Sequence, residues 1–186
     1  MNFKKIHSYF ILIAVFVAFL ITGSCERDDI CSNDTSTTPR LFIEFRDINN
    51  QDELKPVRRL RVIGIDEAGV PIDTLSIEET DPSSVLLPLR VLEQGTLTTT
   101  RYILEKNSDL ADDDDDTTNS EQVIIEIRCT GNFVYVSRAC GYKSVFDFGL
   151  NGSFIITNNP DNWALNSEIV NDFIENEDEA QVYIYH

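Results

Sequence analysis

The sequence predicts a single all-β domain, either a β-sandwich or a partly closed barrel of about eight or nine short strands with little helix. Two observations predict this class. Segments of strand length alternate apolar with polar side chains, and turn residues separate them. Each such strand needs one buried face, and an open sheet would leave too much apolar surface in water. No internal repeat is present.

The first half of the predicted domain, which spans residues 40–186, contains four candidate strands. Residues 40–47 (RLFIEFRD) and 58–66 (RRLRVIGID) both alternate apolar and polar side chains, which predicts half-buried strands. Residues 84–91 are apolar and β-rich, and Pro88 predicts an edge or a bulge there. Residues 96–104 are rich in Thr and contain an aromatic side chain, as strands often are.

An acidic loop and a hairpin follow. Residues 108–120 include five consecutive aspartates at 112–116, whose mutual repulsion predicts a solvated loop. Residues 121–129 and 132–140 are predicted to be two strands joined across Gly131 and Asn132, which have the composition of a two-residue turn.

The C-terminal part contains shorter candidates. Residues 144–148 and 153–157 are predicted strands separated by Asn151-Gly152. Residues 168–175 have apolar side chains at mixed spacing, so one helical turn and a strand are both consistent with them. Residues 180–185 predict a final strand.

The N-terminus has the pattern of an export signal. Lys4 and Lys5 precede an unbroken apolar run of twelve residues at 10–21, whereas a helix needs roughly 20 apolar residues to cross a bilayer. Small residues at 22–24 then lead directly to Cys25, an order that resembles the bacterial lipobox. We therefore expect residues 1–24 to be cleaved and Cys25 to carry diacylglycerol and acyl chains, the one attached group predicted. The alternatives are an ordinary secreted protein cut near Ser24, with Cys25 left as a thiol, and an uncleaved membrane anchor.

The residues after Cys25 refine the location. Glu26, Asp28 and Asp29 follow it closely, at the start of a polar tether at 25–39. This acidic cluster resembles the export signal of Bacteroidota lipoproteins. It predicts the outer membrane, with the cell surface favoured over the periplasmic face. A solvated tether whose charges keep it extended is the alternative.

The net charge excludes some partners. Without residues 1–24 the chain keeps 13 Lys and Arg against 32 Asp and Glu, a formal charge of −19. Binding to nucleic acid is not expected, because phosphate contacts need cationic side chains. The same charge disfavours anionic headgroups, so the acyl chains are expected to supply the membrane attachment.

Three cysteines remain when lipidation uses Cys25: Cys31, Cys129 and Cys140. In an oxidising compartment the simplest outcome is one disulfide and one free thiol. Across the predicted hairpin Cys129 and Cys140 would lie on the order of 20 Å apart, whereas a disulfide needs Cα atoms within about 7 Å. We therefore predict a Cys31–Cys140 disulfide and a buried free thiol at Cys129.

Four segments carry a family resemblance: the acidic residues 26–29 ahead of Cys31, TTPRLFIEF at 37–45, VSRACGY at 136–142 and the final IENEDEAQVYIYH. Together they resemble an uncharacterised flavobacterial lipoprotein family, a domain of unknown function. The resemblance implies an envelope location and supports the Cys31–Cys140 pairing, but it implies no activity. Gln181 stands where members typically have a His, which argues against a metal or catalytic role there.

Catalytic patterns are absent from the sequence. His186 is the one histidine after residue 24, and no nucleophile elbow, phosphate-binding loop or metal-binding Cys or His spacing is present. We expect no enzyme, no catalytic residue and no metal, although so many acids leave a carboxylate pair of the glycosidase type open. The aspartates at 112–116 either collect Ca²⁺ or, as we favour, form solvated surface.

Four residues are candidates for ligand binding or modification, and each also has a structural or chance explanation. Trp163 either stacks on a sugar or, as we favour, folds onto the core. Arg138, placed on a core-facing position, is predicted to pair with a buried acid rather than to bind a ligand. Thr74 and Thr117 lie in Asp-Thr patterns that resemble Bacteroidota O-glycosylation sites, and such three-residue matches arise easily by chance.

Two function classes are left. The favoured one is an accessory subunit without catalytic activity that docks on an outer-membrane β-barrel protein. The other is a surface module that binds a soluble ligand or a glycan. An exposed apolar patch would indicate the first, and a concave pocket with polar groups the second.

Overall fold

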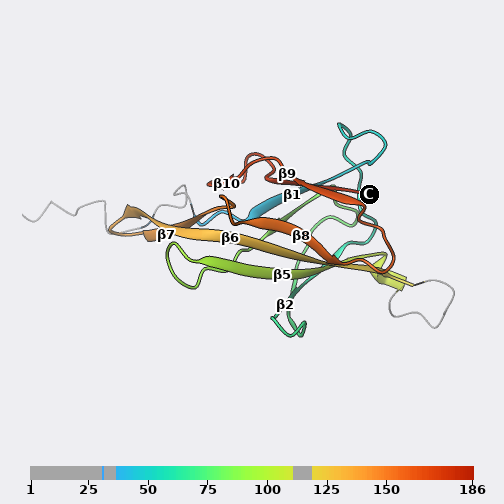
Figure 1. Cartoon of the computed structure of the whole chain (residues 1–186), viewed down its shortest axis with the longest axis horizontal. Coiled ribbons are helices and arrows are strands. Elements are labelled where there is room, and N and C mark those ends of the chain that lie inside the picture. Colours follow the sequence, from blue (N-terminus) through green and yellow to red (C-terminus); the bar gives the residue numbers. More distant parts are fainter. Residues whose placement is uncertain (1–30, 32–36, 111–118) are drawn as a thin grey trace, which may run out of the picture. The chain divides into compact units, whose positions relative to one another are not determined.

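The computed structural model describes residue 31 and residues 37–110 and 119–186. The chain divides into two compact units. Among the described residues, the smaller comprises Cys31 and Val136–Gly141, and the larger comprises residues 37–110, 119–135 and 142–186. The larger unit contains two β-sheets, which Figure 1 shows as two layers of strands.

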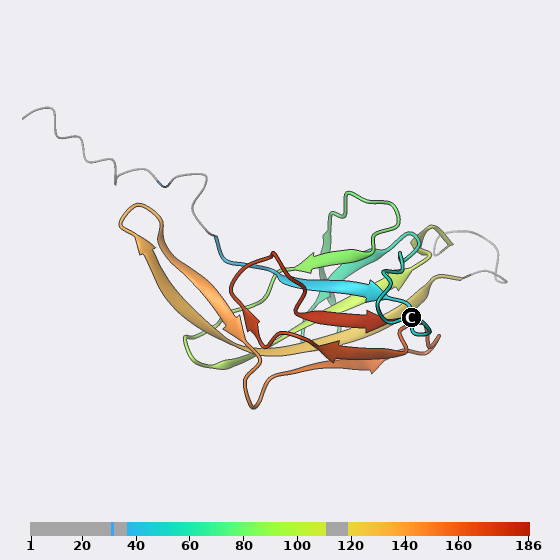
Figure 2. The ribbon, with the colours of Figure 1, turned by 90° about the horizontal axis from the view of Figure 1, so that it is seen from above.

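The smaller sheet has four strands and joins distant parts of the sequence. Its centre is β1 (Leu41–Arg46), which pairs with β4 (Ser84–Leu87) on one side. On the other side β1 runs parallel to β11 (Val182–Tyr185), which in turn pairs with β9 (Asn166–Ile169). Figure 2 shows β1 and β11 side by side in this sheet.

The larger sheet has seven strands. They are β2 (Arg61–Ile65), β3 (Pro71–Leu75), β5 (Leu97–Lys106), β6 (Glu121–Ser137), β7 (Gly141–Asp147), β8 (Ser153–Asn158) and β10 (Phe173–Ile174). Their order is β10-β7-β6-β5-β2-β3, with β8 also paired to β6. The ladders of β2 with β3 and β5, of β6 with β5 and β8, and of β7 with β10 are antiparallel. A short 3₁₀ turn, η2 (Ser108–Leu110), follows β5.

The two sheets bury their apolar faces against each other. In β1 the alternating side chains Leu41, Ile43 and Phe45 are fully buried, because successive residues of a strand point to opposite faces. Strand β6 buries Val123, Ile125, Ile127 and Cys129 in the same way. The architecture is therefore an all-β sandwich, as predicted, and not a closed barrel.

The predicted hairpin turn at Gly131 and Asn132 is wrong. Strand β6 runs without interruption to Ser137, and the turn to β7 occupies residues 138–140. Gly131 instead leaves room for the Val91 side chain, since a Cβ atom at position 131 would lie 2.7 Å from Cγ2 of Val91. Gly141 is the glycine that the turn requires, with φ at +69°, in the left-handed region that glycine adopts without strain.

Other boundaries also differ from the predictions. Strand β4 stops at Leu87, just before Pro88, whereas the predicted strand continued to residue 91. Strand β4 does lie at the edge of its sheet, which agrees with the edge or bulge that Pro88 predicted. Residues 168–175 are neither one helical turn nor one strand: they contain the end of β9 and all of β10, which belong to different sheets. The sequence pattern missed β3, whose side chains are mostly exposed and so show no core-facing alternation.

Candidate functional site

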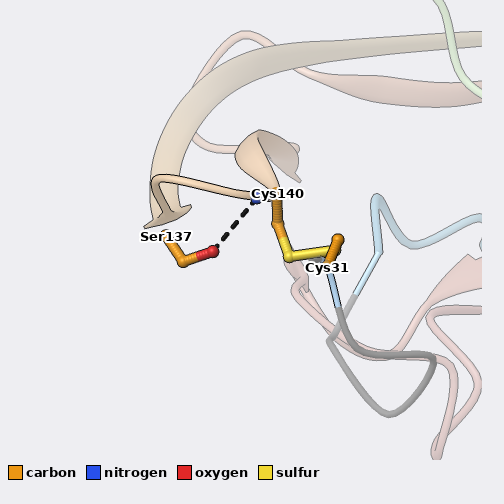
Figure 3. Close-up of a disulfide and its surroundings, with 3 residues drawn as sticks. All are labelled: Cys31, Ser137 and Cys140. Carbon is orange, nitrogen blue, oxygen red and sulfur yellow. Dashed lines mark hydrogen bonds between the residues drawn. A yellow bond between two sulfur atoms is a disulfide. The ribbon is translucent and has the colours of Figure 1, made fainter. Parts of the chain in front are cut away.

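The Cys31–Cys140 disulfide is present, as predicted. The two Cα atoms lie 4.9 Å apart, and both residues belong to the smaller unit. Cys140 is the last residue of the turn between β6 and β7, and its backbone N–H donates a hydrogen bond to Ser137 Oγ at 3.1 Å (Figure 3). The disulfide therefore bonds Cys31 to the β6–β7 turn, across 109 positions of sequence.

Cys129 is a buried free thiol, also as predicted. Its side chain is fully buried on the core face of β6. Burial, with a smaller contribution from Asp147, raises the pKa of this thiol to about 12. Because the thiolate is the reactive form of cysteine, this residue is suited to packing rather than to redox or nucleophilic chemistry.

An exposed aromatic surface lies on β6 and β7. Phe133, Val134, Tyr135 and Tyr142 are 43%, 41%, 55% and 69% exposed, and we call these four residues the aromatic arm. The rings of Tyr135 and Tyr142 meet edge to face with centroids 5.4 Å apart. Consecutive residues of a strand face opposite ways, so exposure of 133, 134 and 135 means that both faces of β6 are uncovered there.

A groove of about 440 Å³ opens beside the edge strand β3. Its apolar lining includes Ile65, Ile72, Leu75, Pro88 and Tyr102. The Tyr102 hydroxyl is already committed, because it donates a hydrogen bond to the Pro88 carbonyl, and burial raises its pKa to about 12. Arg90 and Thr100 add polar groups, but Thr100 Oγ1 accepts a hydrogen bond from the Arg90 backbone N–H at 3.1 Å.

Two carboxylates are buried in the larger sheet, and both are neutralised by arginine. Glu105 is fully buried and accepts hydrogen bonds from Arg61, Ser120 and Gln122 at 2.5, 2.6 and 3.0 Å. Burial alone would raise the pKa of Glu105, but these three donors and the Arg61 charge together hold it below its usual range.

Glu126, the second buried carboxylate, bridges two arginines. It lies 2.7 Å from Arg101 Nε and 2.5 Å from Arg128 at its two oxygens. Burial opposes ionisation of Glu126, but both guanidinium groups outweigh it, and the pKa is lowered. A general acid of the glycosidase type needs a raised carboxyl pKa, so neither Glu105 nor Glu126 is suited to that role.

The C-terminal residues belong to the core. Trp163 is 5% exposed and packs with Phe45 and His186, at centroid distances of 6.5 and 5.9 Å, so the predicted core role is confirmed. Burial lowers the pKa of His186, and its Nε2 lies 3.0 Å from the Lys55 carbonyl. Gln181 is 1% exposed, and its Oε1 accepts the Phe42 N–H at 2.9 Å, which ties it to β1.

The other predicted residues have varied outcomes. The predicted burial of Arg138 is wrong: it lies exposed in the turn after β6, because that turn is seven residues later than the sequence suggested. Thr74 is exposed on β3, where an acceptor of a glycan would have to be. Cys25, Thr117 and the aspartates at 112–116 lie outside the described residues.

Among the described residues, no group of three or more His, Cys, Asp or Glu side chains could hold a metal ion. In this part of the chain no helix is long and apolar enough to cross a membrane. Comparison of the whole chain with protein-family models, with curated proteins and with solved structures finds no significant match.

Proposed function

We propose that this chain is a lipid-anchored lipoprotein of the outer membrane whose β-sandwich acts, without catalysis, as an accessory subunit of an envelope protein complex. The observation that carries the proposal is the Cys31–Cys140 disulfide. Disulfides form and persist in oxidising, extracytoplasmic compartments, which agrees with an exported chain. The disulfide also begins six residues after the cysteine of the lipobox-like segment.

The short connection has a functional consequence. Six residues span at most about 20 Å when fully extended, so a lipid on Cys25 would hold the disulfide-bonded turn within that distance of the membrane surface. A domain held this closely has a high effective concentration toward any other protein of the same membrane. Weak contacts with an outer-membrane β-barrel protein would then be sufficient for a stable complex.

The absence of catalysis in the proposal rests on particular side chains. The two buried carboxylates are paired with arginines, the Cys129 thiol has a raised pKa, and one nitrogen of the His186 ring is bound to a backbone carbonyl. Each of these groups is committed to a contact that stabilises the fold, which leaves it poorly placed to act on a substrate.

A pull-down in mild detergent tests the subunit proposal. The native lipidated protein would be compared with Cys25→Ala, which keeps every residue of the folded domain but has no anchor. We expect the native protein to co-purify with a stoichiometric β-barrel protein and the variant to lose most of it. Purification of the native protein as a monomer under every detergent condition would contradict the proposal.

The groove beside β3 supports a second candidate, a module that binds a soluble ligand or a glycan. It is concave and mainly apolar, with a few polar groups, as ligand sites commonly are. Calorimetric titration with oligosaccharides would test it. Binding that Ile72→Glu abolishes and Leu150→Glu preserves would favour this candidate, because Ile72 lines the groove and Leu150 is fully exposed in the turn before β8.

A further inference from the structure

The aromatic arm occupies a part of β6 that the rest of the larger sheet does not cover. The ladder with β5 ends at Thr130, and the ladder with β8 ends at Arg128. Beyond Thr130, β7 is the strand that continues beside β6. Phe133, Val134 and Tyr135 are therefore exposed on both faces of a two-stranded ribbon.

Such a ribbon is unusual for a surface in water. Large apolar side chains occur singly on protein surfaces, whereas a contiguous group of them marks a contact with another molecule or with a membrane. Tyr is also enriched at the membrane–water interface, where its apolar ring enters the acyl region and its hydroxyl stays near the headgroups, and Phe adds apolar surface beside it.

The disulfide limits how far this ribbon can lie from Cys25. Tyr142 follows Cys140 by two residues, and Cys140 is bonded to Cys31, six residues after Cys25. The covalent path from Cys25 to Tyr142 is thus six residues, one disulfide and two further residues. Given a fully extended rise of about 3.5 Å per residue, a lipid on Cys25 would keep Tyr142 within roughly 35 Å of the membrane.

The local charge also differs from that of the rest of the chain. Residues 127–146 contain no Asp or Glu, although the whole chain has 32. Within this stretch Arg138 and Lys143 are cationic, and Arg138 is exposed in the turn, whereas the third cation, Arg128, is paired with Glu126. Cationic side chains near a membrane surface are attracted to anionic headgroups. This segment is therefore an exception to the repulsion that the acidic chain as a whole predicts.

We propose that the aromatic arm inserts into the headgroup region of the membrane that holds the lipid anchor, and so fixes the orientation of the β-sandwich. The inference rests on the proposed lipidation of Cys25. A lipid surface fits better than a protein partner because two independent features, the short covalent path from Cys25 and the absence of acidic residues, coincide with the exposed rings. The arm then acts as a second membrane contact beside the acyl chains.

Tryptophan fluorescence on vesicles tests this proposal. Tyr135→Trp would be made in the full lipidated protein, which is then reconstituted into vesicles of phosphatidylcholine and phosphatidylglycerol. Lipids brominated on their acyl chains quench only a tryptophan that enters the bilayer. Ile72→Trp is the matched control, since Ile72 is 65% exposed on β3 and Tyr135 is 55% exposed. The wild type gives the background from Trp163, which is buried.

The expected result is a blue-shifted emission for Tyr135→Trp that loses intensity when brominated lipids replace ordinary ones, with no such loss for Ile72→Trp. Equal, unquenched emission from both variants on vesicles would overturn the insertion of the arm. Quenching of both alike would overturn its specificity.

The acyl group and vesicle binding of each variant are measured first, by intact mass and by flotation. If the protein is acylated and floats with the vesicles but its tryptophan is not quenched, the insertion of the aromatic arm is contradicted and the proposed function is not. A protein with no acyl group on Cys25 contradicts the proposed function and, with it, the basis of this inference. A Tyr135→Trp protein that is unquenched on vesicles but blue-shifts when a co-purified β-barrel protein is added would assign the arm to that protein instead.

Discussion

Replacing Gly131 with Ala tests the continuous path of β6 most sharply. A Cβ atom at this position would lie 2.7, 3.2 and 3.4 Å from Cγ2, Cγ1 and Cβ of Val91. Val is stiff at χ1, so rotation of Val91 cannot relieve all three contacts. Overpacking of this kind destabilises the folded state by about 1–3 kcal/mol. The lower chain entropy of Ala in the unfolded state offsets roughly 0.5–1 kcal/mol of this loss. We expect Gly131→Ala to lower the free energy of unfolding by about 1–2 kcal/mol on this balance.

The cause is identified by a second substitution. Val91→Ala removes the two γ carbons that crowd position 131, and because Val91 is only half-buried it should itself cost about 1 kcal/mol. In the double variant the clash is absent, so its loss of stability should be smaller than the sum of the two single losses by about 1–2 kcal/mol. Urea unfolding of the four proteins with the disulfide intact gives each free energy.

Gly69→Ala is the matched control. Gly69 has φ at +82°, and a Cβ atom added there would have no neighbour within 4 Å, so its cost comes from backbone strain that Val91→Ala cannot relieve. Gly69→Ala and Val91→Ala should therefore add. If Gly131→Ala and Val91→Ala also add within about 0.5 kcal/mol, the contact between Gly131 and Val91 is refuted.

Three further variants or reagents test the core and the buried charges. Glu105→Gln should lower the free energy of unfolding at neutral pH by about 1–3 kcal/mol, because the buried carboxylate accepts three hydrogen bonds. The folded pKa of Glu105 is lowered, so this stabilisation is present above the unfolded pKa and is lost as pH falls through the folded pKa. Urea unfolding should therefore show the stability gap to wild type narrowing as the pH falls below about 4.5, and a gap that stays constant would argue against the ion pair. Cys129 should react with iodoacetamide only when the protein is unfolded, as peptide mass mapping can show, and rapid labelling of the native protein would contradict its burial. Phe45→Ala should cost about 3–5 kcal/mol and shift the emission of Trp163 to the red, whereas an unchanged spectrum would contradict the packing of these two rings.

Period-two alternation was sufficient to predict the strands with one buried face. Leu41, Ile43 and Phe45 in β1 are fully buried, and the same face of β6 carries Cys129, so both strands and the buried thiol followed from the pattern. Alternation fails at β3, whose exposed side chains show no core-facing rhythm, whereas residues 133–135, also exposed, were predicted as part of a strand. The parallel pairing of β1 with β11 joins the two ends of the domain, and no local pattern records it.

Glycine caused the main error in the candidate site. Gly131 followed by Asn132 has the composition of a hairpin turn, but the glycine is needed because Val91 approaches from another segment. Composition cannot separate those two uses of glycine. The Cys31–Cys140 pairing was nevertheless correct, since Cys129 lies within the β6 ladder and Cys140 lies beyond it in the turn. The shifted turn also explains why Arg138 is exposed rather than paired in the core.

The central claim is that Cys25 anchors this disulfide-bonded β-sandwich to a membrane. Metabolic labelling with an alkyne fatty acid, followed by coupling to a fluorophore and gel analysis, tests it directly in wild type and in Cys25→Ala. Cys129→Ala is the control, because its thiol is buried in the folded domain. We predict a labelled band for wild type and for Cys129→Ala, and none for Cys25→Ala. Equal labelling of Cys25→Ala and wild type would contradict the claim.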